Sequence, residues 1–199
     1  MINKITLILL LFSFSFSAIA QQQYQLDTKK SKILWKIETV GKHNGYILFS
    51  YGKLEYNTKG TPLTASFIID MKNIKSLDRP TEKGRGEIDN ELRTPGFFDV
   101  EVYPTATMIV KQIFVTPVLN VFRITGDLTI KGITHRIEFN ASIIKNGNTI
   151  KAKANFNIAR IKWNIDFKEK PNEWSFTSAI KNKMIDDDIQ IALDLTFGK

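Results

Sequence analysis

The sequence predicts an all-β protein, a sandwich or barrel of about eight strands with one short helix. Three observations lead to this fold class. Apolar and polar residues alternate along most of the chain, helical periodicity is nearly absent, and turn-forming residues separate the alternating segments. Several segments are apolar on one face only, which is typical of a sheet that closes around one interior.

Alternation is clearest between residues 149 and 159. Every even-numbered position from Ile150 to Ile158 is apolar, and lysine or asparagine occupies the positions between them. Alternate side chains of a strand point to opposite faces, so this segment has an apolar face and a polar face. The same pattern predicts strands within residues 33–38, 65–70, 105–110, 122–131, 133–141 and 189–195.

The connections between these segments carry turn signals. Asn146-Gly147 predicts a hairpin with positive φ at both turn positions, and residues 57–62 form a second turn cluster. Gly132 either separates two strands or marks a bulge within one bent strand. One short helix is predicted near Glu87–Arg93, and Pro95 ends it.

The first twenty residues predict a signal peptide. Lys4 gives a positive start, residues 5–16 are almost entirely apolar, and Ala18-Ile19-Ala20 supplies the small residues that signal peptidase accepts. The apolar run is short for a membrane-spanning helix, which favours cleavage. We therefore expect an exported protein whose single domain covers residues 21–199.

Charge and cysteine content narrow the set of partners. The formal net charge is +8, and the basic residues are scattered, with no run of four or more. This distribution favours a solvated basic surface with no nucleic acid as partner, although transient contact with an anionic membrane surface stays open. The chain has no cysteine, so burial must hold the fold without disulfides.

Residues suited to catalysis or metal binding do not form a known pattern. His43 and His135 lie far apart, no serine lies in a G-x-S-x-G context, and no glycine-rich phosphate loop occurs. Asp186-Asp187-Asp188 lacks the spaced oxygen ligands, the glycine and the distal glutamate of a calcium loop. We therefore predict no catalytic residue and no metal site.

The chain does supply a large apolar surface. It contains 14 phenylalanines and 3 tryptophans, and the candidates for inward positions include Ala65, Ala106, Ala152 and Ala154. Small inward residues leave room for a ligand, but they also let opposite walls of a solid core approach each other. An eight-stranded barrel permits either arrangement, and periodicity alone does not choose between them.

Gly126–Thr134, which reads Gly-Asp-Leu-Thr-Ile-Lys-Gly-Ile-Thr, resembles the most recognisable signature of the YceI-like family of bacterial periplasmic lipid-binding proteins. Four further stretches resemble family landmarks in the right order, and the resemblance covers essentially all of residues 21–199. They are Asp27 and Ser31 before Ile33-x-Trp35-x-Ile37, then His43-Asn44-Gly45, then Asp89-x-x-Leu92-Arg93 with Phe97-Phe98-Asp99-Val100 and Tyr103-Pro104, and finally Ile158-x-Arg160-x-x-Trp163.

The chain departs from the family pattern at four polar or turn positions. Lys30 and Glu91 stand where the family often has histidine, Ile88 where it has arginine, and Asn164 where it has glycine. These departures leave the expected fold unchanged and bear on the polar contacts that the family makes with a headgroup near the helix.

The resemblance implies a lipocalin-like extended antiparallel β-barrel whose apolar tunnel holds an isoprenoid lipid, either a polyprenyl or a quinone chain, for carriage or storage. It also implies a non-catalytic protein of the periplasm, with secretion not excluded, and no cofactor beyond the bound lipid. Arg160 and His43 are candidates for a polar headgroup contact, although Arg160 is better suited to pairing with Asp89 or Asp99. The expected tunnel lining is Trp35, Ile37, Phe49, Phe67, Ile69, Phe98, Met108, Leu128, Ile130, Phe139, Phe156 and Trp163.

Two other functions stay open at this point. The barrel could be the scaffold of a non-catalytic interaction module in an envelope stress or redox system, which would require an exposed apolar patch away from the tunnel mouth. A weaker alternative is an enzyme that acts on the bound lipid through His43 or Arg160. The identity of the lipid and the formation of a homodimer also stay open.

Overall fold

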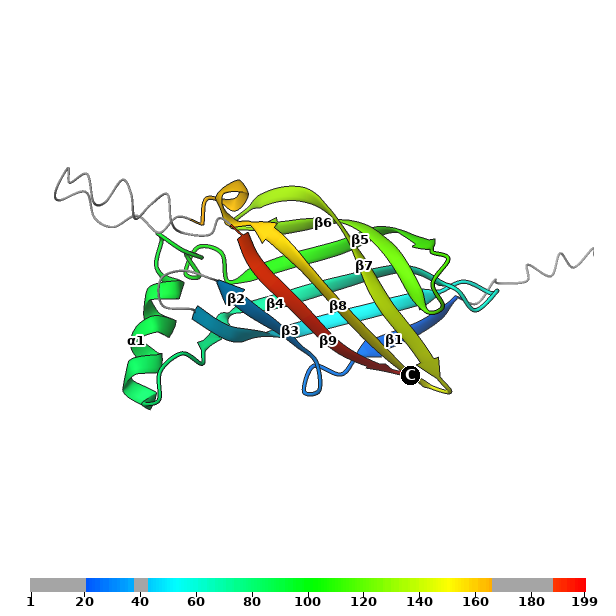
Figure 1. Ribbon diagram of the computed structural model, residues 1–199, viewed down its shortest axis with the longest axis horizontal. Helices are drawn as coiled ribbons and strands as arrows, with labels where there is room; N and C mark the ends of the chain where they lie inside the picture. The colour runs from blue at the N-terminus through cyan, green and yellow to red at the C-terminus, as the bar shows by residue number, and fades with distance from the viewer. Residues whose placement is uncertain (1–20, 38–42, 166–187) are drawn as a thin grey trace, which may run out of the picture.

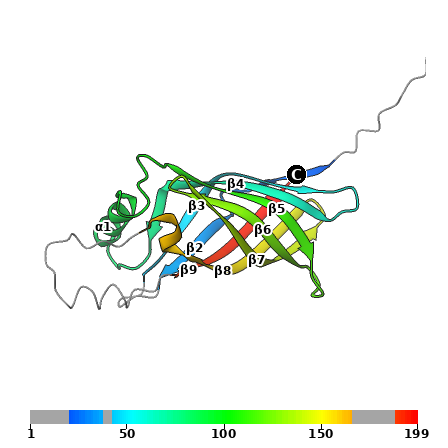
Figure 2. The ribbon, with the colours of Figure 1, turned by 90° about the horizontal axis from the view of Figure 1, so that it is seen from above.

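An elongated β-barrel with a helix at one end accounts for the described part of the chain (Figure 1). The structure is a computed structural model and describes residues 21–37, 43–165 and 188–199. The predicted signal segment, residues 1–20, lies outside the described residues, as do Asp186 and Asp187. The view from above places α1 at one end of the barrel and the C-terminus toward the other (Figure 2).

Within the described ranges the chain forms nine strands, one α-helix and one short 3-10 helix. The elements are β1 (Gln22–Leu26), β2 (Lys32–Ile37), β3 (His43–Tyr56), β4 (Pro62–Ser76), α1 (Glu82–Arg93), β5 (Thr105–Val115), β6 (Val121–Ile130), β7 (Ile133–Asn146), β8 (Thr149–Ala159), η1 (Arg160–Trp163) and β9 (Asp188–Gly198).

All neighbouring strands are antiparallel, in the order β1-β3-β2-β9-β8-β7-β6-β5-β4. The pairing of β3 with β4 closes this sheet into a barrel. β2 pairs with the first residues of β3, and β1 pairs with the last ones, so the two short strands share a single position around the ring. The ring therefore has eight positions, which confirms the expected lipocalin-like barrel.

The alternating pattern of the sequence is the inside–outside pattern of the barrel. In β8, Ile150 and Ala152 are buried while Lys151 and Lys153 are exposed. β3 follows the pattern less regularly, because its register against β4 shifts between Phe49 and Tyr51 and leaves two successive residues exposed. This irregularity explains why alternation alone did not identify β3 as a strand.

The helix begins earlier than the sequence predicted. It starts at Glu82 because the Thr81 hydroxyl accepts a hydrogen bond from the backbone N–H of Gly84, which caps the first turn. The predicted range near Glu87–Arg93 covers only the second half, where apolar residues face the barrel. Its end at Arg93 was predicted correctly from Pro95.

The hairpin predicted at Asn146-Gly147 forms, but its turn lies one residue later. Asn146 pairs with Thr149, so the two-residue turn between β7 and β8 is Gly147-Asn148 and not Asn146-Gly147. Gly147 has a φ of 57°, and no positive φ occurs at Asn148. Between β6 and β7 the turn is Lys131-Gly132, so Gly132 separates two strands and does not mark a bulge in one.

A buried carboxylate fastens the helix to the barrel wall. Asp89 of α1 accepts a hydrogen bond from the backbone N–H of Ser76 at 2.6 Å and forms an ion pair with Lys75 Nζ at 3.2 Å. Both partners lie at the end of β4. Because Asp89 is buried, these contacts replace the water that the carboxylate loses on folding.

The end of the barrel opposite α1 is filled by aromatic side chains. Tyr24 and Tyr56 are buried there with ring centroids 5.5 Å apart, and Lys145 Nζ lies 5.0 Å from the centre of the Tyr56 ring. Burial, with a smaller contribution from Tyr24, raises the pKa of Tyr56 to about 12. The phenol is therefore held in its neutral form.

Replacing Asp89 with alanine should destabilise the protein by about 1–3 kcal/mol, because the buried N–H of Ser76 loses its acceptor. Urea unfolding followed by circular dichroism measures the effect. Asp194→Ala is the matched control, since Asp194 makes only a half-exposed ion pair with Lys153 at 3.8 Å and should change stability by less than about 1 kcal/mol. Equal effects of the two substitutions would contradict the anchoring role of Asp89.

Tyr56 should make stability fall at alkaline pH. Its pKa of about 12 in the folded protein lies above the unfolded value of about 10, so its contribution is complete below about pH 10 and is lost as the pH rises toward 12. Ultraviolet titration of tyrosinate should show one late phase that Tyr56→Phe removes. The variant should also lose less stability than the wild type between these pH values, and an unchanged titration curve would disprove the assignment.

Candidate functional site

The barrel interior contains an apolar cavity that its own side chains do not fill. Its volume is about 110 Å³, several times the 10–15 Å³ that one water molecule needs. Every lining residue is apolar, so water would find almost no hydrogen-bond partner there. The lining comprises Ile33, Trp35, Ile37, Ile47, Phe49, Phe67, Ile69, Met71, Ile74, Leu92, Phe98, Ala106, Met108, Val110, Leu128, Ile130, Ile137, Phe139, Phe156, Ile158, Ile189, Ile191, Leu193 and Leu195.

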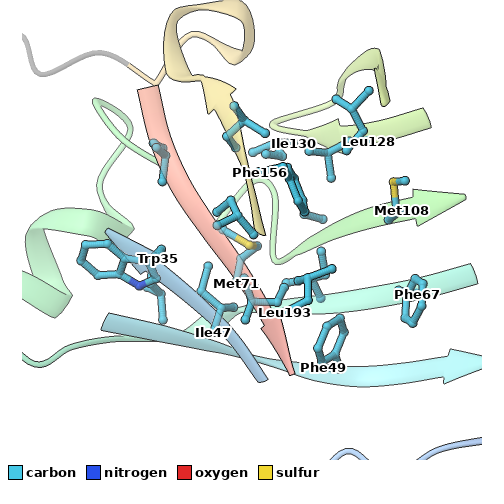
Figure 3. A pocket seen from close by; sticks show the side chains of 18 of the residues that line it. Trp35, Ile47, Phe49, Phe67, Met71, Met108, Leu128, Ile130, Phe156 and Leu193 are labelled. Carbon is cyan, nitrogen blue, oxygen red and sulfur yellow. The ribbon is translucent and has the colours of Figure 1, made fainter. Parts of the chain in front are cut away.

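Incomplete burial of inward side chains also indicates a void. Phe67, Phe139, Phe156 and Leu193 line the cavity, yet each is only half-buried, whereas neighbouring inward residues are buried. Figure 3 shows Phe67, Phe156 and Leu193 on different strands around the interior, with space between them. The cavity is therefore bounded by apolar surface that a nonpolar ligand could cover.

Eleven of the twelve residues predicted as tunnel lining lie on the cavity wall, and their contact with a ligand stays a prediction. The exception is Trp163, which is 1% exposed and lies in η1 beyond the end of β8. Its indole N–H donates a hydrogen bond to the Leu128 carbonyl at 3.3 Å, and its ring packs edge-on against His135. Trp163 therefore fastens η1 to the barrel wall.

Sequence reasoning missed several lining residues for two reasons. Ile191, Leu193 and Leu195 were recognised as one face of a strand, but alternation does not show whether that face points inward. Met71 and Ile74 of β4 lie three residues apart, so no strict alternation marks them. Leu92 reaches the cavity from α1, where a strand pattern carries no information.

The two polar candidates occupy different environments. Arg160 is 4% exposed, does not line the cavity, and donates a hydrogen bond from Nη1 to the Ile165 carbonyl at 2.9 Å. Asp89, proposed from sequence as its partner, is bonded to Ser76 and Lys75. His43 is half-exposed at the helix end, with Nδ1 2.7 Å from Asp78 Oδ2.

A second, more polar hollow adjoins the cavity beneath α1. It shares Trp35, Ile37 and Leu92 with the apolar cavity, and it adds the charged or polar side chains of His43, Arg79 and Glu91. We call this hollow the vestibule; Ile88 and Phe97 complete its lining. The helix end of the barrel thus combines an apolar interior with a polar rim.

Trp35 lies where the vestibule and the cavity meet. It is buried on β2 at the side of the cavity nearest α1 (Figure 3). Its ring packs over Gly45, where a Cβ atom would lie only 2.5 Å from the indole. Among the described residues, its Nε1–H has no hydrogen-bond acceptor. A buried indole donor without an acceptor is uncommon, because the lost hydration is uncompensated.

The described residues contain no group of three or more His, Asp or Glu side chains placed to hold a metal ion. None of their helices has the length and apolar character needed to cross a membrane.

Comparison with solved structures shows that the chain shares its fold with known proteins. BcnA from Burkholderia cenocepacia has a similar fold, with a TM-score of 0.65 and 22% identity over 86% of this chain and 98% of that chain. A polyisoprenoid binding domain from Saccharophagus degradans gives a TM-score of 0.60 and 13% identity over 88% and 97% of the two chains. A Campylobacter jejuni YceI protein gives 0.52 and 20% identity over 69% and 73%.

A search of the curated proteins finds no significant match. The sequence model of the YceI-like domain, in contrast, matches residues 24–197, which is nearly the whole of the described barrel. This chain belongs to the YceI-like family.

Proposed function

We propose that the protein binds an isoprenoid lipid, a polyprenyl or quinone chain, inside its barrel and carries or stores it without chemical change. The observation that carries this proposal is the continuous apolar lining around an unfilled interior. The similarity in fold to a domain described as polyisoprenoid binding supports it. The signal-peptide pattern of residues 1–20 supports a periplasmic location for this activity.

The size of the hydrophobic effect explains why a long enclosed site is needed. Each isoprenoid unit has five carbons, and burial contributes about 0.8 kcal/mol per carbon group. A few units therefore give on the order of 10 kcal/mol, comparable with the roughly 4–15 kcal/mol lost when a ligand is immobilised. A shallow surface groove would cover too little of the chain, whereas a barrel interior encloses it.

The ligand's polar head is proposed to lie at the helix end. The vestibule holds His43, Arg79 and Glu91, and the wall between vestibule and cavity includes the Trp35 N–H donor. This N–H is buried, so the indole must shift before an oxygen on the head of a prenol or quinone accepts its hydrogen bond while the tail extends into the cavity. His43 therefore stays a headgroup candidate, and the buried Arg160 is better suited to holding η1 in place.

An exposed apolar loop favours a second candidate function, the interaction module. The turn between β5 and β6 exposes Val115, Val118 and Leu119 at 73%, 62% and 85%, away from the vestibule. Thr116 orders this turn by donating its hydroxyl proton to the Val121 carbonyl. An envelope partner could bind such a rigid apolar tip, and this function would not need an open cavity.

Filling the cavity should abolish lipid binding while leaving the fold intact. Ala106 lines the cavity from β5, so Ala106→Phe places a ring in the ligand's path and should reduce bound lipid at least about tenfold. Native mass spectrometry of protein purified from its own host measures the bound lipid. Ile109→Phe, which enlarges an exposed residue of the same strand, is the control and should retain wild-type loading.

The same pair of variants separates the two candidate functions. If Ala106→Phe loses its lipid and also its activity in the host, the cavity is the functional site. A wild-type protein that carries no lipid and takes up neither polyprenols nor quinones would disprove the proposal. An Ala106→Phe protein that remains fully active in the host would favour the interaction module.

Trp35→Phe tests the headgroup position. The substitution keeps an aromatic ring and removes the N–H, so binding of an oxygen-bearing prenol should weaken about two- to tenfold, the effect of one hydrogen bond. An isoprenoid hydrocarbon of the same length has no acceptor and should bind both proteins equally. Titration by tryptophan quenching from the remaining tryptophans measures both ligands. Equal losses for the two ligands would indicate a packing defect and contradict the donor role.

A further inference from the structure

The interior contains a second apolar cavity beyond the first. Its volume is about 50 Å³. It lies toward the end of the barrel that is filled by aromatic residues, and Leu54 and Phe197 are part of its lining. We call it the inner chamber. It shares five residues with the main cavity, namely Phe67, Val110, Phe139, Leu193 and Leu195. These shared side chains form a partition across the barrel.

Phe67 is the central member of this partition. Its ring centroid lies 5.7 Å from that of Phe49, which lines the main cavity only, and 6.1 Å from that of Phe197, which lines the inner chamber only. The three rings therefore form a row that crosses from one cavity to the other. Removing the middle ring would connect the two spaces.

The Phe67 ring fits in this place because the neighbouring residue on β3 is a glycine. Phe67 of β4 is paired with Gly52 of β3, and a Cβ atom on Gly52 would lie 2.9 Å from the Phe67 ring. The ring thus occupies space that any other residue at position 52 would fill. On the other side, Phe67 is paired with Met108 of β5, whose methyl group fits against Gly126 in the same way.

The opposite wall of the partition is also aromatic. Phe139 of β7 stacks on Phe156 of β8, with ring centroids 4.2 Å apart and an interplanar angle of 13°. In the ring of strands, β7 and β8 lie across the barrel from β4. Aromatic side chains therefore narrow the interior from both sides. The inner chamber lies beyond this narrowing, where the small side chains of Ala65 and Ala154 form part of its wall.

We infer that Phe67 sets the maximum length of the isoprenoid chain that this protein accepts, by separating the main cavity from the inner chamber. This inference rests on the proposed function and adds a basis for its specificity. A chain that enters from the vestibule passes Trp35 and Phe49 and ends against Phe67. A longer chain would have to displace the ring toward Phe197 or leave its surplus units exposed at the helix end, and either change costs free energy.

The test is a series of all-trans polyprenols of increasing length, each offered to delipidated protein and measured by native mass spectrometry. Wild-type protein should bind chains up to a limit and lose affinity beyond it. Phe67→Ala should raise that limit by at least one isoprenoid unit, because the inner chamber becomes part of the site. Thermal unfolding of each variant in parallel shows that the protein remains folded.

A double variant controls for general loosening of the barrel. Ala154 lines the inner chamber and not the main cavity, so Ala154→Phe fills the chamber without narrowing the main site. Alone it should leave the wild-type limit unchanged. Combined with Phe67→Ala it should cancel the gain and restore the wild-type limit. A gain that persists in the double variant would overturn the inference.

The polyprenol series tests lipid binding and the role of Phe67 separately. If wild-type protein binds no polyprenol of any length, the proposed function falls. If it binds the series without a length limit, or with a limit that Phe67→Ala does not move, lipid binding stands and the role of Phe67 is wrong.

Discussion

The pairing of β3 with β4 is the interaction on which the rest of the structure depends. Without it the sheet would have two open edges, and the inward faces of the strands would not enclose a common space. Closure also fixes the circumference, because eight strand positions set the width of the interior independently of the side chains that fill it. The cavity is therefore a consequence of a closed backbone whose inward residues are too small, or too far apart, to meet.

The positions of small residues determine where the interior stays open. Gly52 and Gly126 leave room beside the inward-pointing Phe67 and Met108, so these two side chains pack against the strands that neighbour them. Ala106, by contrast, keeps the main cavity wide between its larger neighbours. A barrel of uniform large residues would pack as a solid core. This sequence places large and small residues around the ring, which yields two spaces of different size on either side of Phe67.

The fold could be predicted from sequence because strand alternation and turn residues are local signals. Eleven of the twelve residues predicted for the tunnel wall lie on it, since a closed barrel directs one face of every strand inward. Trp163 lies off the cavity wall because it follows β8 in a 3-10 helix, where strand alternation no longer applies. The partition at Phe67 could not be predicted, because it depends on register across three strands. The role proposed for Trp35 depends on a buried N–H without an acceptor among the described residues, a feature that no sequence pattern marks.

The two ends of the barrel differ in a way that gives the interior a direction. At the helix end, His43, Arg79 and Glu91 surround an apolar opening, so a polar group remains hydrated while its tail is buried. At the other end, Tyr24 and Tyr56 are buried, and this burial disfavours a charge and raises the pKa of Tyr56. A lipid with one polar end would lose hydration if it entered head first. For the proposed lipid ligand, this difference favours entry tail first, with the head at the vestibule.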